Sequence, residues 1–103
     1  MVEVLRQGDV AVVTLCHGKA NLLDLESCRA IDATFAELAH DRPRAVILTG
    51  RGRIFCAGVD LNRVVSGGTD YVREFLPALG RVFRTVFEFP LPVIAAMNGH
   101  AVA

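Results

Sequence analysis

The sequence lacks tryptophan and has a single tyrosine, and its 11 basic residues balance its 11 acidic residues. Nucleic-acid-binding domains usually show a basic surface and aromatic side chains that stack on bases, so the composition does not indicate that class. The same neutrality leaves no electrostatic attraction to an anionic membrane. No segment approaches the roughly 18 consecutive apolar residues that a transmembrane helix needs. We therefore expect neither nucleic acid nor a membrane as a partner.

Cysteine is also scarce. Cys16, Cys28 and Cys56 make an odd number, and no C-x-x-C pair occurs. This pattern predicts neither a disulfide framework nor a metal site, and it favours reduced thiols in a cytoplasmic protein. The first residues, Met1–Arg6, lack the uninterrupted apolar segment of a signal peptide. The expected location is therefore the cytoplasm.

The chain is rich in apolar residues, which make up 52% of its 103 residues. This length and composition predict one globular domain. Two β-rich runs, Val2–Arg6 and Val10–Cys16, flank a turn signal, and the second is apolar on both faces, so we expect it to be covered on both sides. Apolar residues at helical spacing predict a helix over Leu25–His40, capped by Asp24. The apolar run Ala45–Leu48 then predicts a buried parallel strand, which makes the domain α/β.

The second half of the chain shows a less regular pattern. We expect one helical turn over Leu61–Val65, a flexible break at Ser66–Thr69, and a helix over Asp70–Phe89. Pro77 lies inside that pattern and should kink or restart the helix. The last apolar run, Val93–Met97, predicts a strand at or near the edge of the sheet.

Between these halves, a strand leads into a glycine-rich loop and a tight corner. The loop Gly50–Arg53 could hold a phosphate through its backbone and arginines, or it could be an ordinary exposed loop. The corner Cys56–Asp60 could bind a developing oxyanion through the N–H of Val59, or it could be a tight turn capped by Asp60. Cys56 lacks an evident basic partner, so the sequence does not indicate a nucleophile there.

Four segments occur in an order that is informative as a set: the strand Val10–Leu15, the loop Lys19-Ala20-Asn21-Leu22-Leu23-Asp24, the block Ala45–Leu61, and Pro90–Ala101. With this set, the chain resembles the enoyl-CoA hydratase/isomerase family, also called the crotonase family. The resemblance implies a spiral of ββα units, of which residues 1–103 would be an incomplete N-terminal portion. The apolar ending at Ala103 fits that expectation.

The resemblance also implies a ligand, an acyl-CoA thioester, and no cofactor other than the coenzyme A that is part of this substrate. By position, Val59 matches the residue whose backbone N–H is one of two oxyanion donors. The residues expected to bind the substrate are Lys19, Ala20, Ala57, Gly58 and Asp60.

The family pattern places its second oxyanion donor, its acid and base residues and the helices that help form trimers beyond Ala103. The expected function is therefore the thioester-binding part of a hydratase or isomerase of fatty acid metabolism, with the 103 residues alone inactive. The alternatives are a non-catalytic remnant with weak or no CoA binding and an unrelated nucleotide-binding module. The sequence does not choose among the reactions of the family.

Overall fold

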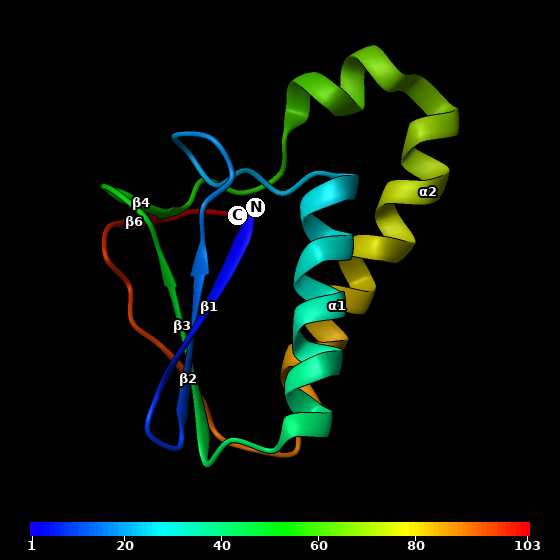
Figure 1. The fold of residues 1–103 in the computed structure, drawn as a ribbon. Coiled ribbons are helices and arrows are strands. Elements are labelled where there is room, and N and C mark those ends of the chain that lie inside the picture. The colour runs from blue at the N-terminus through cyan, green and yellow to red at the C-terminus, as the bar shows by residue number, and fades with distance from the viewer.

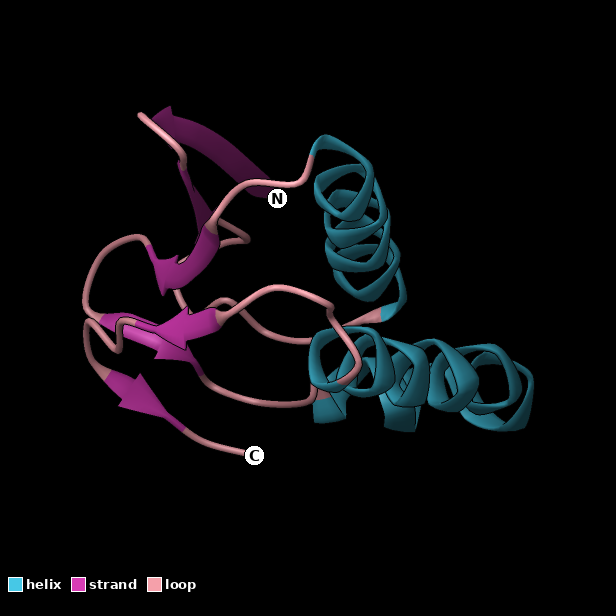
Figure 2. Cartoon of the chain, turned by 90° about the horizontal axis from the view of Figure 1, so that it is seen from below, coloured by secondary structure: helices cyan, strands magenta, loops and turns pink.

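A computed structural model describes residues 1–103 as a strand layer beside two helices (Figure 1). Viewed from below, the strands and helices remain on opposite sides, with the connecting loops between them (Figure 2). The elements, in chain order, are β1 (Val2–Gln7), β2 (Val10–Leu15), α1 (Leu25–Asp41), β3 (Ala45–Gly50), β4 (Ile54–Cys56), α2 (Leu61–Phe87), β5 (Val93–Ala95) and β6 (His100–Ala101).

The main sheet has the strand order β1-β2-β3-β5. β1 and β2 form the predicted antiparallel hairpin, while β2, β3 and β5 run parallel to one another. Parallel neighbours need a crossover connection, which α1 supplies between β2 and β3. β5 lies at the sheet edge, as the sequence predicted. β4 and β6 form a separate parallel pair.

Only one face of β2 is buried, which corrects the expectation that both faces are covered. Ala11, Val13 and Leu15 point into the core, whereas Val10 and Val12 are half-buried. The side chains of a strand alternate between its two faces, so α1 covers one set and no element of this chain fully covers the other.

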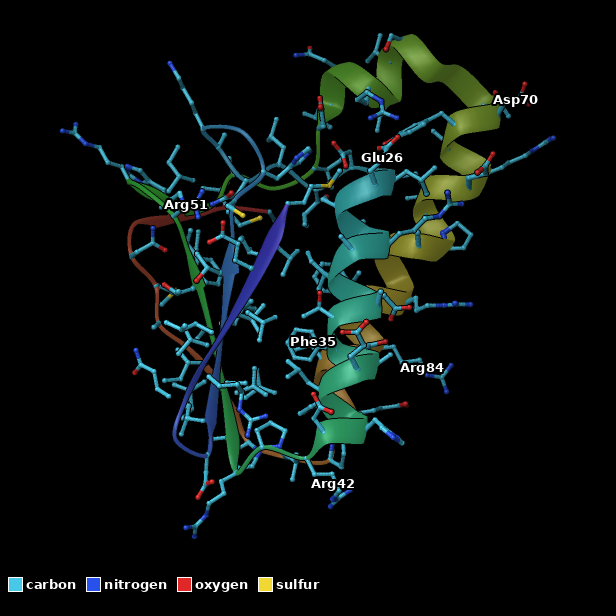
Figure 3. The ribbon with its side chains drawn as sticks, in the orientation of Figure 1. Glu26, Phe35, Arg42, Arg51, Asp70 and Arg84 are labelled. Carbon is cyan, nitrogen blue, oxygen red and sulfur yellow. The ribbon has the colours of Figure 1, made fainter.

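Helix α1 follows its sequence signals closely. The Asp24 carboxylate accepts the N–H of Ser27, and the Ser27 hydroxyl accepts the N–H of Asp24, which completes a capping box. Arg42 ends the helix in the left-handed conformation. Phe35 points from α1 toward the sheet (Figure 3) and packs edge-to-face on Phe89 at 5.2 Å between ring centres. The predicted apolar face is buried along its whole length: Leu25, Cys28, Ile31, Phe35 and Leu38.

Helix α2 agrees with its prediction at the expected break and differs from it at the proline. It begins at Leu61 and continues to Phe87, and its only non-helical residue is Gly68, with φ 67° and ψ −157°. The expected break over Ser66–Thr69 is thus confined to one residue, where the helix changes direction (Figure 1). Pro77 keeps helical backbone angles, so the predicted restart there is wrong. Neither helix has the length and apolar character needed to cross a bilayer.

Candidate functional site

Two segments carry the residues that the sequence singled out. One is the β2–α1 loop, residues 16–24, and the other is the β4–α2 corner, residues 56–60. They lie side by side, because Leu23 and Val59 form an isolated parallel bridge. The structure therefore brings the predicted positions Lys19 and Ala20 to the same region as the predicted oxyanion donor.

Backbone hydrogen bonds join the loop and the corner at three points. Ala57 N–H donates to the Ala20 carbonyl at 3.0 Å, and Leu23 N–H donates to the Gly58 carbonyl at 2.7 Å. Asp60 N–H donates back to the Leu23 carbonyl at 3.0 Å. This ladder uses backbone groups on both sides of Val59 and holds the corner in one conformation.

The N–H of Val59 is left without an acceptor. Its neighbour Gly58 donates to the Cys56 sulfur at 3.4 Å, and Asp60 donates to Leu23, but no hydrogen bond from Val59 N–H is present. The residue is half-buried, and α2 begins two positions later at Leu61. A free amide beside a helix N-terminus can donate to an anionic or strongly polarised oxygen.

Gly58 cannot carry a side chain at this corner. Its φ is +89°, and an added Cβ would lie 2.6 Å from the Ala103 carbonyl oxygen and 2.9 Å from that of Val102. Val102 N–H also donates to the Cys56 carbonyl at 2.8 Å. The final residues of the chain are thus packed directly against the corner.

The Asp60 carboxylate caps α2 by accepting the N–H of Arg63 at 3.2 Å. The expected capping role of Asp60 is therefore confirmed, and the capped element is helix α2. This role is compatible with a free Val59 N–H, because the cap uses the Asp60 side chain and not the amide of Val59.

The cations near the corner are not equivalent. Lys19 and Arg53 are exposed and make no ion pair. Arg51 is engaged by Glu3, and this contact raises the pKa of the arginine above its ordinary value. In the glycine loop, Gly50 N–H donates to the Asn98 side chain and the Gly52 carbonyl accepts from it, both at 2.9 Å. The loop is therefore held by Asn98, which favours its interpretation as an ordinary exposed loop.

Sequence reasoning missed two side-chain interactions in the β2–α1 loop. His17 Nε2 lies 2.6 Å from Asp24 Oδ2, which ties the start of the loop to the cap of α1. Burial raises the pKa of Asp24, but hydrogen bonds from Ser27 and His17 and the attraction to His17 lower it more, so the net pKa lies below its ordinary value. Asn21 makes the second interaction, and its side chain joins the loop to β4.

A cavity of about 230 Å³ lies elsewhere, between α1 and α2. It includes none of the residues of the loop or corner. Its lining is Cys28, Arg29, Asp32, Glu74, Pro77, Ala78 and Arg81. Cys28 lines it with a thiol whose pKa burial raises to about 11, so this cysteine is protonated and unreactive at neutral pH.

Comparison with known proteins agrees with the order of segments and with the fold. Residues 6–103 match the family model described as enoyl-CoA hydratase/isomerase. The chain belongs to this family.

Individual relatives show the extent of the match. The short-chain-enoyl-CoA hydratase of Clostridium acetobutylicum is 38% identical over 99 residues, which are 93% of this chain and 38% of the relative. The structure of Pseudomonas aeruginosa DspI has a TM-score of 0.87 at 32% identity over 95% of this chain and 41% of that one. The structure of Bacillus anthracis enoyl-CoA hydratase also has a TM-score of 0.87, at 30% identity over 95% of this chain and 40% of that one. The chain thus spans about two fifths of the length of the relatives it matches and has the corresponding portion of their fold.

Proposed function

We propose that the β4–α2 corner binds the carbonyl oxygen of an acyl-CoA thioester, with the Val59 N–H as one donor. The observation that supports this is the unpartnered Val59 N–H between two amides that already have acceptors. A donor aimed at a developing oxyanion is worth about 3 kcal/mol in the transition state. The partial positive charge at the start of α2 would add to this stabilisation.

The remaining substrate contacts follow from the surroundings of Val59. In the proposed complex, the unpaired ammonium of Lys19 approaches the phosphates of coenzyme A. Ala20 and Ala57 supply small surfaces along which the ligand lies, and Gly58 allows close approach of the carbonyl. Asp60 supports the corner by capping α2, the helix that follows it. The name of the Clostridium relative, a short-chain-enoyl-CoA hydratase, supports an acyl-CoA as the ligand class.

We propose that this chain contributes to a hydratase or isomerase reaction by stabilising an enolate. When a nucleophile adds to the β-carbon of an enoyl thioester, or when a proton leaves the α-carbon, an electron pair moves onto the thioester oxygen. The Val59 N–H would share that negative charge. The groups that move protons and the second oxyanion donor are proposed to lie outside these 103 residues. A cytoplasmic location remains part of the proposal, supported by the three unpaired thiols.

The test is a titration of the isotope-labelled 103-residue chain with acetoacetyl-CoA, followed by the amide resonance of Val59. The matched control ligand is a CoA thioether of the same chain length, which has the same nucleotide and no thioester carbonyl. A downfield shift of the Val59 amide proton with the thioester and not with the thioether supports the proposal. Equal shifts with both ligands, or no shift at saturating thioester, contradict it.

The alternative function is that of a non-catalytic remnant. Calorimetry separates the two possibilities, because heat of binding at micromolar acetoacetyl-CoA supports a usable thioester site and its absence supports the remnant. Hydratase turnover by the 103 residues alone would contradict the proposal that catalysis needs groups outside them.

A further inference from the structure

Asn21 makes the only side-chain hydrogen bonds between the β2–α1 loop and the segment that carries the corner. Its Nδ2 donates to the carbonyls of Ile54 and Phe55, at 3.0 and 3.2 Å. Its Oδ1 accepts the N–H of His17 at 2.8 Å. One amide group therefore fixes the start of the loop and, at the same time, the strand that leads directly into the corner.

The surroundings of Asn21 show that its side chain is buried and held in place. The residue is 2% exposed and has φ 49°, in the left-handed region that asparagine tolerates better than most residues. Its own N–H donates to the His17 carbonyl at 3.0 Å, which closes a tight turn around it. Both the donor and the acceptor of the side-chain amide are used inside the protein, where a lost partner is costly.

The position of this side chain connects it to the free amide. Asn21 directly follows Ala20, whose carbonyl accepts from Ala57, and it lies two positions before Leu23, which bridges Val59. The backbone ladder is therefore formed on both sides of Asn21, and the carbonyls that Asn21 holds come immediately before the corner. Movement of β4 away from the loop would shift the direction of the Val59 N–H.

We propose that Asn21 is a positioning residue that aims the Val59 N–H at the thioester carbonyl by holding β4 against the β2–α1 loop. This inference rests on the proposed function for the identity of the ligand. It does not place Asn21 in contact with substrate. The expected consequence is that Asn21 affects recognition of the carbonyl and not recognition of the CoA nucleotide.

Two variants separate the side-chain bridge from the backbone conformation. Asn21→Asp keeps the shape and the acceptor but loses the amide donors and places a carboxylate oxygen against two carbonyls. Asn21→Gly removes the bridge and accepts the left-handed conformation without strain. Asn98→Asp is the matched control, because it removes an amide donor from the Gly52 carbonyl in the glycine loop, outside the β2–α1 loop and the corner.

The measurement is the ratio of affinities for acetoacetyl-CoA and the CoA thioether, by calorimetry, for the full 103-residue chain and each variant. We expect both Asn21 variants to lower this ratio about tenfold and Asn98→Asp to leave it unchanged. A purely structural role would weaken both ligands equally. An unchanged ratio in Asn21→Gly overturns the inference.

Amide hydrogen exchange without ligand gives a second, independent readout. We expect the amides of Ala57 and Leu23 to exchange faster in Asn21→Gly, while protection of the α1 core stays unchanged. Unchanged protection at both amides, or global unfolding of both Asn21 variants, overturns the inference, since either result excludes a local positioning role. If the unaltered chain binds no thioester, the proposed function fails, and hydrogen exchange still decides whether Asn21 holds the corner.

Discussion

The two halves of the chain differ in how they are stabilised. All but two of the eleven core hydrophobic residues lie between Ala11 and Val46, and α2 adds only Phe75 and Val82. Most of the large apolar side chains that remain exposed come from Leu61 onward. Residues 54–60 lie between these halves and attach to the first through the hydrogen bonds of the β2–α1 loop. The candidate site is therefore attached to the well-buried half by these hydrogen bonds, and to the second half by the pairing of β4 with β6 and the hydrogen bond from Val102 to Cys56.

The largest expected effect comes from removing a core side chain of the first half. Phe35 is fully buried, so Phe35→Ala should lower the free energy of unfolding by about 3–5 kcal/mol. Phe87 in α2 is 90% exposed, and Phe87→Ala should change it by less than about 0.5 kcal/mol. Urea unfolding of both variants measures the difference, and similar losses would mean that the two halves are equally important to the core.

A smaller effect is expected at the corner. Gly58→Ala introduces both backbone strain, at φ +89°, and a clash with the backbone of Val102 and Ala103. Gly52→Ala introduces similar strain, at φ +85°, with nothing within 4 Å of the new Cβ. We expect the free energy of unfolding to fall by about 1 kcal/mol in Gly52→Ala and by about 2–4 kcal/mol in Gly58→Ala.

Thermal unfolding of the two glycine variants provides the measurement. If both variants lose the same stability, the final residues do not pack on the corner as described. A larger loss in Gly58→Ala shows that the second half contributes to the site through this contact.

The smallest effect is expected for the charge that caps α1. The pKa of Asp24 is lowered in the folded chain, so the unfolded state binds its proton more readily. The stabilisation from this charge is therefore complete above the unfolded pKa of about 4 and is lost as the pH falls through the lower folded value. Asp24→Asn keeps a capping side chain but cannot titrate. We expect its free energy of unfolding to be about 1 kcal/mol below that of the unaltered chain at neutral pH, and we expect this difference to shrink as the pH is lowered below 4.

Urea unfolding at pH 7 and at two values below pH 4 measures this dependence. Asp41→Asn is a suitable control at neutral pH, because Asp41 is exposed at the end of α1 and makes no ion pair. A deficit of Asp24→Asn that grows with acidity would mean that the Asp24 pKa is raised, and not lowered, by folding.

The sequence was a reliable guide to the first half because its signals are local. Asp24 and the periodic residues from Leu25 to Leu38 specify a cap and one helix face within a few turns. In α2, the local signals were reliable in one place and not in another. The break expected over Ser66–Thr69 is present as the kink at Gly68. Pro77 also predicts an interruption, yet the burial of Phe75 and Val82 against the core keeps the helix continuous on both sides of the proline.

For the candidate site, residue order predicted which positions come together, and the resemblance supplied their proposed roles. The contacts of Asn21 could not be predicted in the same way, since its carbonyl partners lie 33 and 34 residues further along the chain. A side-chain amide at that distance leaves no periodic pattern in the sequence. Only the fold shows which carbonyls it reaches.

The pairing of β3 with β5, and of β4 with β6, also has a consequence for synthesis of the chain. Val46 aligns with Val93, and Ile54 aligns with His100. On a ribosome, the hairpin, α1 and β3 emerge early and can associate first, whereas the β4–α2 corner contacts Val102 and Ala103 only after these later residues have been synthesised. Such long-range contacts slow folding, so the corner should reach its final geometry later than the hairpin, α1 and β3.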